Sequence, residues 1–458
     1  MSILILFILL AILVLLEVPV AFAMTLSAIL FLAFDGMVSP QIVVQRLAPS
    51  LDSFPLLAVP MFILAGNLLN KSGIAERIFD FALSVVGHVR GSLAHVNVLA
   101  SIIFSGMSGV AAADAAGLGK IEMQAMEREG FDKGFSAAVT GASSIIGPII
   151  PPSTIMVIYA VSAGTSLSAM FLAGVIPGLL MGLILMATIY FLCVAKVVKV
   201  PARPRAQWGH IGETFVAAFP GLLAPLVLVG GLLTGIATPT ELSAIIVVYA
   251  ALLGVIYKEL NTSILWECMV DTIITCGVIV FVFAAASPFA WIMAYWDFPQ
   301  QLADAMMGLT SNKLLILVIL NFGLLFFGCF IETGALLVIS VPVLAPLLQQ
   351  IHVDPVHFGI ILILNLMVGA NTPPFGVILF VMMDVAKVSF SQYIRSFMPF
   401  YVPQLAILFL ITFLPAICLW LPHIVEGDSV SYKASENSYE QGIVLQKETS
   451  LEYWQKNL

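Results

Sequence analysis

The chain has 458 residues, of which 61% are hydrophobic and 10% are charged, with a net charge of −8 at pH 7 and a mean hydropathy of +1.09. This composition excludes an ordinary soluble domain and predicts an all-α polytopic membrane protein. The sequence has no GxxxxGK[ST] phosphate-binding loop, so we expect no ATP hydrolysis by this chain, and we expect no cofactor. Its five isolated cysteines show no metal-type spacing.

In chain order, the first apolar run begins at the N-terminus without a basic flank or a clear cleavage site, so we interpret it as a retained helix rather than a cleaved signal. Several later runs approach the length of about 20 residues that a helix needs to cross a bilayer. The clearest runs are Ala169–Cys193, Ala217–Gly235, Leu242–Ile256 and Phe397–Leu421. Residues 423–458 form a polar tail with weak periodicity, which we expect to be mobile.

Two short stretches are amphipathic. Ile74–Val86 and Phe298–Leu309 each have apolar residues on one face and polar or charged residues on the other, the pattern of a helix that lies along a surface. We interpret them as arms that join a moving part of the protein to a fixed part, and ordinary connecting helices are the alternative.

The sequence matches itself when it is shifted by 222 residues. GPIIPPS, from Gly147, then overlies GANTPPF, from Gly369, without a gap. The same shift aligns Gly106 with Gly328, Asp132 with Asp354, and Pro177 with Pro399. We therefore interpret the chain as two copies of one unit, residues 1–200 and residues 207–422.

Basic residues indicate how the two copies are oriented. The joint from Lys196 to Arg205 carries four basic residues and no acidic one, which predicts a cytoplasmic position. Counting crossings from this joint places residues 91–133 on the cytoplasmic side and residues 313–355 on the exterior side. The sequence therefore predicts an inverted repeat.

Each copy also contains an apolar segment that is interrupted near its centre, too long for one crossing and too short for two. We interpret residues 91–130 and residues 313–352 as re-entrant helical hairpins. Each hairpin is followed by a helix that a double proline breaks, over residues 131–163 and residues 354–388.

The double prolines explain the breaks. A proline removes the N–H that would bond the carbonyl four residues earlier, so Pro151 and Pro373, each followed by a second proline, leave main-chain carbonyls without partners. Such a carbonyl costs several kcal/mol in hydrocarbon, and a hard, desolvated cation is a suitable partner for it. The next half-helix begins with free N–H groups, which suit a carboxylate. The alternative is a kink whose carbonyls are satisfied by neighbouring helices and water. The predicted cation ligands are the carbonyls of Gly147, Pro148, Gly369 and Ala370.

The wider cation and anion site includes groups at the hairpin tips and beside the breaks. We place the tips at Ser105–Gly109 and Gly328–Gly334. The candidate set is Ser105, Gly106, Ser108, Ser143, Ser144, Gly147, Pro148, Pro151, Gly328, Glu332, Thr333, Gly334, Gly369, Ala370, Asn371, Thr372 and Pro373.

Acidic residues inside a membrane are costly and usually functional. Asp114 and Glu332, near the hairpin tips, are the strongest candidates, whereas Glu17 and Glu241 stand beside prolines and fit turns. For Glu332 the alternatives are a protonated carboxyl group and a helix cap.

Five stretches together resemble the large membrane subunit of tripartite ATP-independent periplasmic (TRAP) transporters over about residues 1–421: LLAVPMFILAGNLL, FSGMSGVAAADAAGLG, TGASSIIGPIIPPS, GIATPTE and VGANTPPFG. The resemblance implies an elevator-type secondary transporter of the bacterial inner membrane, in which hairpins and broken helices move against a scaffold. It also implies sodium coupling, a small four-helix membrane subunit, and a periplasmic binding protein that delivers a small organic acid anion. No nucleic acid is expected as a partner. The polar tail departs from the family pattern.

Two other functions fit parts of the sequence. A stand-alone sodium/carboxylate carrier of the same architecture would need neither protein partner. An intramembrane serine protease would use Ser108 of the GMSG stretch, but His95 lies thirteen residues away, about 20 Å along one helix. The predicted site selects an anion class rather than one molecule, so a C4-dicarboxylate and a sialic acid fit equally well.

Overall fold

The computed structural model describes residues 3–109, 111, 115, 118–196 and 204–426. Asp114 and the tail from residue 427 onward lie outside the described residues. Within these ranges every regular element is a helix and no strand is present. The first half contains α1 (Leu4–Leu15), α2 (Val20–Asp35), α3 (Gln41–Leu47), η1 (Pro49–Leu51), η2 (Phe54–Leu57), α4 (Ala58–Lys71), α5 (Ile74–Val86), α6 (Ser92–Ser108), α8 (Leu118–Arg128), α9 (Lys133–Ser144), α10 (Thr154–Ala163) and α11 (Leu167–Val194). The second half contains α12 (Trp208–Thr234), α13 (Pro239–Ile256), α14 (Thr262–Tyr295), α15 (Phe298–Leu309), α16 (Lys313–Gly328), α17 (Thr333–Gln350), α18 (Pro355–Ala370), α19 (Val377–Ala386), α20 (Phe390–Phe413) and α21 (Ala416–Glu426).

In the described part of the chain, seven helical segments are long and apolar enough to cross a membrane. They are Phe54–Lys71, which includes α4, and the helices α11, α12, α13, α14, α17 and α20. The chain is therefore a multi-pass membrane protein. The predicted single span Phe397–Leu421 is wrong, because α20 ends at Phe413 and α21 begins only at Ala416. Pro415 forces the preceding Leu414 out of the helical conformation.

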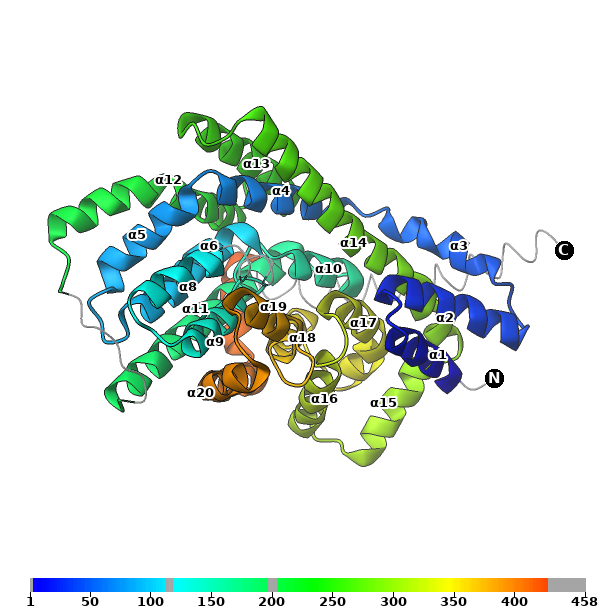
Figure 1. The fold of residues 1–458 in the computed structure, drawn as a ribbon. Helices are drawn as coiled ribbons and strands as arrows, with labels where there is room; N and C mark the ends of the chain where they lie inside the picture. The colour runs from blue at the N-terminus through cyan, green and yellow to red at the C-terminus, as the bar shows by residue number, and fades with distance from the viewer. Residues whose placement is uncertain (1–2, 110, 112–114, 116–117, 197–203, 427–458) are drawn as a thin grey trace.

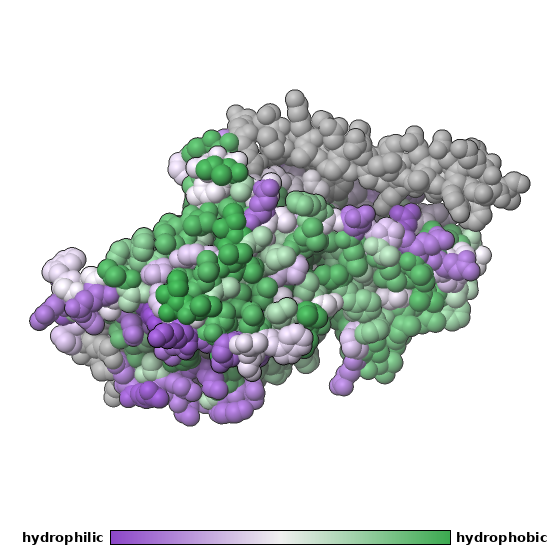
Figure 2. Space-filling view, turned by 90° about the horizontal axis from the view of Figure 1, so that it is seen from above, coloured by the Kyte–Doolittle hydropathy of each residue, from purple (hydrophilic) through white to green (hydrophobic). Residues whose placement is uncertain are grey.

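The helices differ in how much apolar surface they leave uncovered. Large side chains on α12, α13 and α14 are exposed, for example Val216 (70%), Val248 (60%) and Ile273 (67%). Figure 2 shows apolar residues over much of one face, with hydrophilic residues gathered along its rim. By contrast, every residue of α18 from Val356 to Ala370 is buried. A helix that is apolar and buried on all sides belongs to the centre of the molecule.

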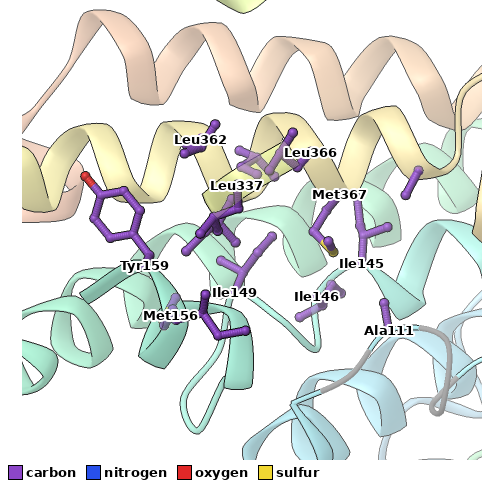
Figure 3. Packing of buried hydrophobic residues seen from close by; sticks show 14 of the residues in the cluster. Ala111, Ile145, Ile146, Ile149, Met156, Tyr159, Leu337, Leu362, Leu366 and Met367 are labelled. Carbon is purple, nitrogen blue, oxygen red and sulfur yellow. The ribbon is translucent and has the colours of Figure 1, made fainter. Parts of the chain in front are cut away.

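The two predicted broken helices are observed, and they pack against each other at this centre (Figure 1). The first is α9 followed by α10, and the second is α18 followed by α19. The second part of each contacts the first part of the other, α10 with α18 and α19 with α9. Figure 3 shows Ile145 and Ile149, between α9 and α10, facing Leu366 and Met367 of α18. The Tyr159 hydroxyl of α10 also donates a hydrogen bond to the Pro355 carbonyl at the start of α18 (2.5 Å).

Both predicted amphipathic helices are observed with the expected bounds, as α5 and α15. α5 contacts α6 and α12, and α15 contacts α17 and α14. Each therefore joins one helix of a predicted hairpin to one of the exposed apolar helices.

Candidate functional site: two helix breaks

The first break spans residues 145–153, between α9 and α10. Its backbone is buried except at the partly covered Ile150, and no described group donates a hydrogen bond to the carbonyl of Gly147 or Pro148. Ser153 closes the break by capping α10, since its hydroxyl accepts a bond from the Met156 N–H (3.3 Å). The two carbonyls that the sequence singled out are therefore among several acceptors of this segment without a donor in the described residues, together with those of Ile145, Ile149, Ile150, Pro151 and Pro152.

Glycines allow other helices to approach the first break closely. Gly109, at the end of α6, has a φ of +66°, and a Cβ there would collide with the Pro152 carbonyl. A Cβ at Gly106 would lie 2.5 Å from Pro225 of α12. On α11, a Cβ at Gly174 would collide with the Ile149 carbonyl, and one at Gly178 with Ile150. Gly109 and α11 thus cover the break, whereas the closest contact of Gly106 is with α12.

Hydroxyl and amide groups join the first hairpin to α9. Asn97 of α6 donates to the Thr140 hydroxyl (2.7 Å) and accepts from Ser143 (2.7 Å), and Ser101 donates to Ser143 (3.1 Å). The Ser105 hydroxyl donates to the Ser101 carbonyl on its own helix. In this geometry the candidate ligand Ser143 joins α6 to α9, whereas Ser105 bonds within α6. The side chain of Ser108 lies outside the described atoms.

The second half has a corresponding amide cluster. Asn365, which matches Ser143 at the 222-residue shift, donates to the Asn321 side-chain oxygen (2.8 Å). Asn321 in turn donates to the Thr412 hydroxyl (3.0 Å). The Asn365 side-chain oxygen is buried without a donor among the described groups, as is that of Gln404. A buried acceptor of this kind suits water or a cation.

The second break spans residues 371–376, between α18 and α19. The expectation that the Gly369 carbonyl lacks a partner is wrong, because the Thr372 N–H donates to it (2.9 Å) in a tight turn. No described group donates to the Ala370 carbonyl. Both X–Pro bonds of the pattern, Pro151–Pro152 and Pro373–Pro374, are cis.

Asn371 uses both ends of its amide. Its nitrogen donates to the Gly141 carbonyl of α9 (2.5 Å), and its oxygen accepts from the hydroxyl of Tyr393, on α20 (2.9 Å). The Thr372 hydroxyl donates to the Val368 carbonyl (2.7 Å). The candidate side chains beside this break are therefore already hydrogen-bonded within the protein.

At the second hairpin tip, Glu332 caps α17. Its two carboxylate oxygens accept from the N–H groups of Gly334 and Ala335, each at 2.9 Å. The side chain is exposed, so the capping alternative describes this geometry, and Thr333 is the first residue of the capped helix. A Cβ built at Gly369 would lie 3.1 Å from the Gly328 Cα, so the tip and the break touch through backbone. Glu17, in the turn after α1, and Glu241, in the capping box of α13, lie at turns as expected.

Sequence patterns missed several polar residues of this region. The residues Asn97, Asn321, Asn365, Tyr393 and Gln404 are buried and hydrogen-bonded, yet none of them belongs to a recognisable motif. Asn321 and Asn365 stand in apolar stretches, and the other three lie on helices that carry further polar residues. For Asn365 the signal was available, since the repeat aligns it with Ser143. In the described residues no cluster of three His, Cys, Asp or Glu side chains forms a metal site, so oxygen ligands at the breaks would come from backbone, hydroxyl and amide groups.

This fold is that of helical membrane transporters. It is similar to the solved Alcanivorax borkumensis YdaH transporter (TM-score 0.61, 15% identity, covering 82% of this chain and 88% of that one). It is also similar to Neisseria gonorrhoeae MtrF, described among antimetabolite efflux pumps (TM-score 0.54, 14% identity, 83% and 84%). At these identities the comparison shows the fold alone.

The family follows from closer matches. The profile of the DctM component of tripartite ATP-independent periplasmic transporters matches residues 7–417, and the chain belongs to this family. It is 42% identical to the Vibrio cholerae sialic acid TRAP transporter large permease protein SiaM, over 89% of this chain and 96% of that protein. It is 38% identical to the Haemophilus influenzae sialic acid permease SiaT (89% and 66%) and 35% identical to the Pseudomonas aeruginosa C4-dicarboxylate permease DctM (82% and 88%). The predicted resemblance is confirmed.

Proposed function

We propose that the chain is the large permease subunit of a sodium-coupled secondary transporter that imports an organic acid anion. The observation that carries this proposal is the first break, where the buried carbonyls of Gly147 and Pro148 have no donor beside a hairpin tip that reaches Pro152 through Gly109. Backbone oxygens of this kind suit a hard cation. We place one sodium ion at each break, and at the second break the Ala370 carbonyl is one acceptor to which no described group donates.

The relatives support the anion class. The names of several relatives include a substrate: sialic acid, isethionate, 2,3-diketo-L-gulonate or a C4-dicarboxylate. All four substrates are organic anions. A free helix N-terminus favours such a charge, and α19 begins at Val377 without a side-chain cap. The substrate of this chain is therefore an organic acid of the C4-dicarboxylate or sialic acid class, bound near the second break.

An elevator motion fits the way the helices connect. The moving domain would contain the hairpins (α6 with α8, and α16 with α17) and the broken helices, as inverted units of residues 1–200 and 207–422. The scaffold would contain α4, α12, α13 and α14, where Lys71 bonds Glu267 (2.8 Å) and Asn67 bonds Thr272 (3.0 Å). α5 and α15, which contact both groups, are the arms.

The family name describes a tripartite transporter, and we propose an assembly of three proteins. A small four-helix membrane subunit would cover part of the exposed apolar surface, and a periplasmic binding protein would deliver the anion to the permease in the bacterial inner membrane. The stand-alone sodium/carboxylate carrier is the alternative that this assembly excludes.

Reconstitution in proteoliposomes tests the proposal. Uptake of a radiolabelled acid, first chosen as one that the binding protein retains, should require an inward sodium gradient and both partners. Uptake without the partners would identify the stand-alone carrier, and uptake unaffected by sodium would overturn the coupling.

The protease alternative has a separate test. His95 and Ser108 lie at opposite ends of α6, and His95 is bonded to the Arg90 carbonyl (2.9 Å). Ser108→Ala should retain at least partial uptake, and hydrolysis of a membrane peptide that this variant abolishes would support the protease instead.

A further inference from the structure

The C-terminal end of α9 shows how the first break is tied to the second half of the chain. Helix ends leave their last carbonyls without intrahelical donors. In α9 the Gly141 carbonyl accepts from the Asn371 side-chain nitrogen (2.5 Å) as well as from the Ser144 hydroxyl of its own helix (3.0 Å). The Ala142 carbonyl accepts from the Gln404 side-chain nitrogen (3.3 Å). Asn371 and Gln404 each lie more than two hundred positions from the residue that they contact, so the second copy contributes to the cap of the broken helix of the first.

The orientation of the Asn371 amide is fixed by its partners. A carbonyl only accepts hydrogen bonds, so the side-chain nitrogen must face Gly141. The oxygen then faces Tyr393, which is fully buried and donates its hydroxyl proton to Asn371. Asn371 stands in the second break itself, and it therefore links that break to α9 and α20 at once.

The backbone of α9 is shaped to receive this link. A Cβ at Gly141 would collide with the Tyr393 hydroxyl. A Cβ at Gly134, seven residues earlier on α9, would lie 2.9 Å from Gln392 and from Ser396 of α20. The two glycines let α20 approach closely enough for both amide contacts, so the link depends on missing side chains as well as on polar groups.

We propose that Asn371, Tyr393 and Gln404 are positioning residues, forming a brace that aligns the two helix breaks so that sodium binding at one favours binding at the other. The proposal rests on the proposed sodium coupling. Two sites that share one rigid connection respond to each other's ligand, and the coupling is lost when the connection loosens. Asn371 then acts through the backbone that it holds rather than through an ion contact of its own oxygen.

The principal test replaces Tyr393 with Phe, which keeps the ring and removes the donor. In the full chain with its small subunit and binding protein, the half-saturating sodium concentration should rise about 3- to 10-fold, as the loss of one hydrogen bond predicts. Sodium dependence should become less cooperative, while the maximal uptake rate per folded transporter changes little.

Tyr249→Phe is the matched control, because the Tyr249 hydroxyl donates to the Pro220 carbonyl (2.6 Å), away from both breaks. The sodium response of this variant should stay unchanged. A Tyr393→Phe variant that lowers only the maximal rate, or only the amount of folded protein, overturns the proposal.

Asn371→Asp distinguishes the brace from a direct ion ligand. Aspartate keeps an oxygen for Tyr393 but loses the donor to Gly141, so the brace predicts weaker sodium activation. A direct ligand would gain charge, and tighter sodium activation would overturn the proposal.

A measurement without sodium separates the brace from the proposed function. Thermal unfolding of the purified complex should show that Gly141→Ala destabilises wild type more than it destabilises Tyr393→Phe, because the hydroxyl that its methyl group would strike is gone. Additive effects would overturn the brace. If uptake by the wild type shows no activation by sodium, the proposed function is overturned instead. The comparison of the Gly141→Ala, Tyr393→Phe and double variants by thermal unfolding still tests the brace in that case.

Discussion

The two helix breaks match in sequence but differ in their surroundings. Residues 145–153 are covered by the first hairpin tip and by α11, and Ser153 is fully buried. In the second break Pro374 and Phe375 are exposed, Phe375 to 56%. The Gly369 carbonyl already has a backbone donor, whereas the Gly147 carbonyl has none. Proline placement therefore determines where a helix breaks, and the neighbouring elements determine how accessible the break is and which acceptors stay free.

Chemical accessibility gives the largest expected difference between the breaks. In a cysteine-free background, a charged thiol reagent should modify Phe375→Cys about 10- to 100-fold faster than Ser153→Cys, because a buried thiol reacts only after local opening. The labelling rate in membranes that contain the whole assembly is the measurement. Equal rates would remove the distinction between a closed and an open break.

The matched glycines at the hairpin tips give the next effect. Gly106→Ala places a methyl group 2.5 Å from Pro225, and overpacking of this kind costs about 1 to 3 kcal/mol. Gly328→Ala meets nothing closer than 3.5 Å. The initial uptake rate per folded transporter should fall about tenfold or more for Gly106→Ala and change little for Gly328→Ala. The reverse order would contradict the tighter packing around the first hairpin tip.

Double alanine substitutions at the prolines test the free carbonyls. Pro151→Ala with Pro152→Ala restores two N–H donors that compete with an ion for the Gly147 and Pro148 carbonyls, so half-saturating sodium should rise about tenfold. The same change at Pro373 and Pro374 should have a smaller effect, since Gly369 is already bonded. Sodium titration of uptake is the measurement, and unchanged activation in the first variant would count against the site.

Glu332 should give the smallest change. Glu332→Gln keeps an oxygen that accepts from the start of α17, so the unfolding temperature should fall slightly, within the cost of a weakened cap of about 1 kcal/mol. Sodium activation should be unaffected. Loss of sodium dependence in this variant would restore Glu332 as an ion ligand.

Local pattern was enough to predict the positions of the breaks and of the two amphipathic helices, because proline chemistry and helical periodicity act within a few residues. The cap of α9 was not predictable in this way. Gly141 and Asn371 are separated by 230 positions in the sequence. The residues that surround Tyr393 and Gln404 in the sequence form no motif that indicates a hydrogen bond from either side chain to another part of the chain. The turn that closes the Gly369 carbonyl also depends on how residues 371–376 fold back, which the prolines alone do not specify.

The glycines of α11 have a consequence for how transporters of this kind can change. Gly174 and Gly178 let α11 approach the first break closely, because a Cβ at Gly174 would collide with the Ile149 carbonyl and one at Gly178 with the Ile150 side chain, although α11 offers no charged group there. Under the proposed sodium coupling, mutations that enlarge these two residues would change sodium activation from a helix that supplies no proposed ligand, so selection for new coupling properties could act at such remote, chemically inert positions.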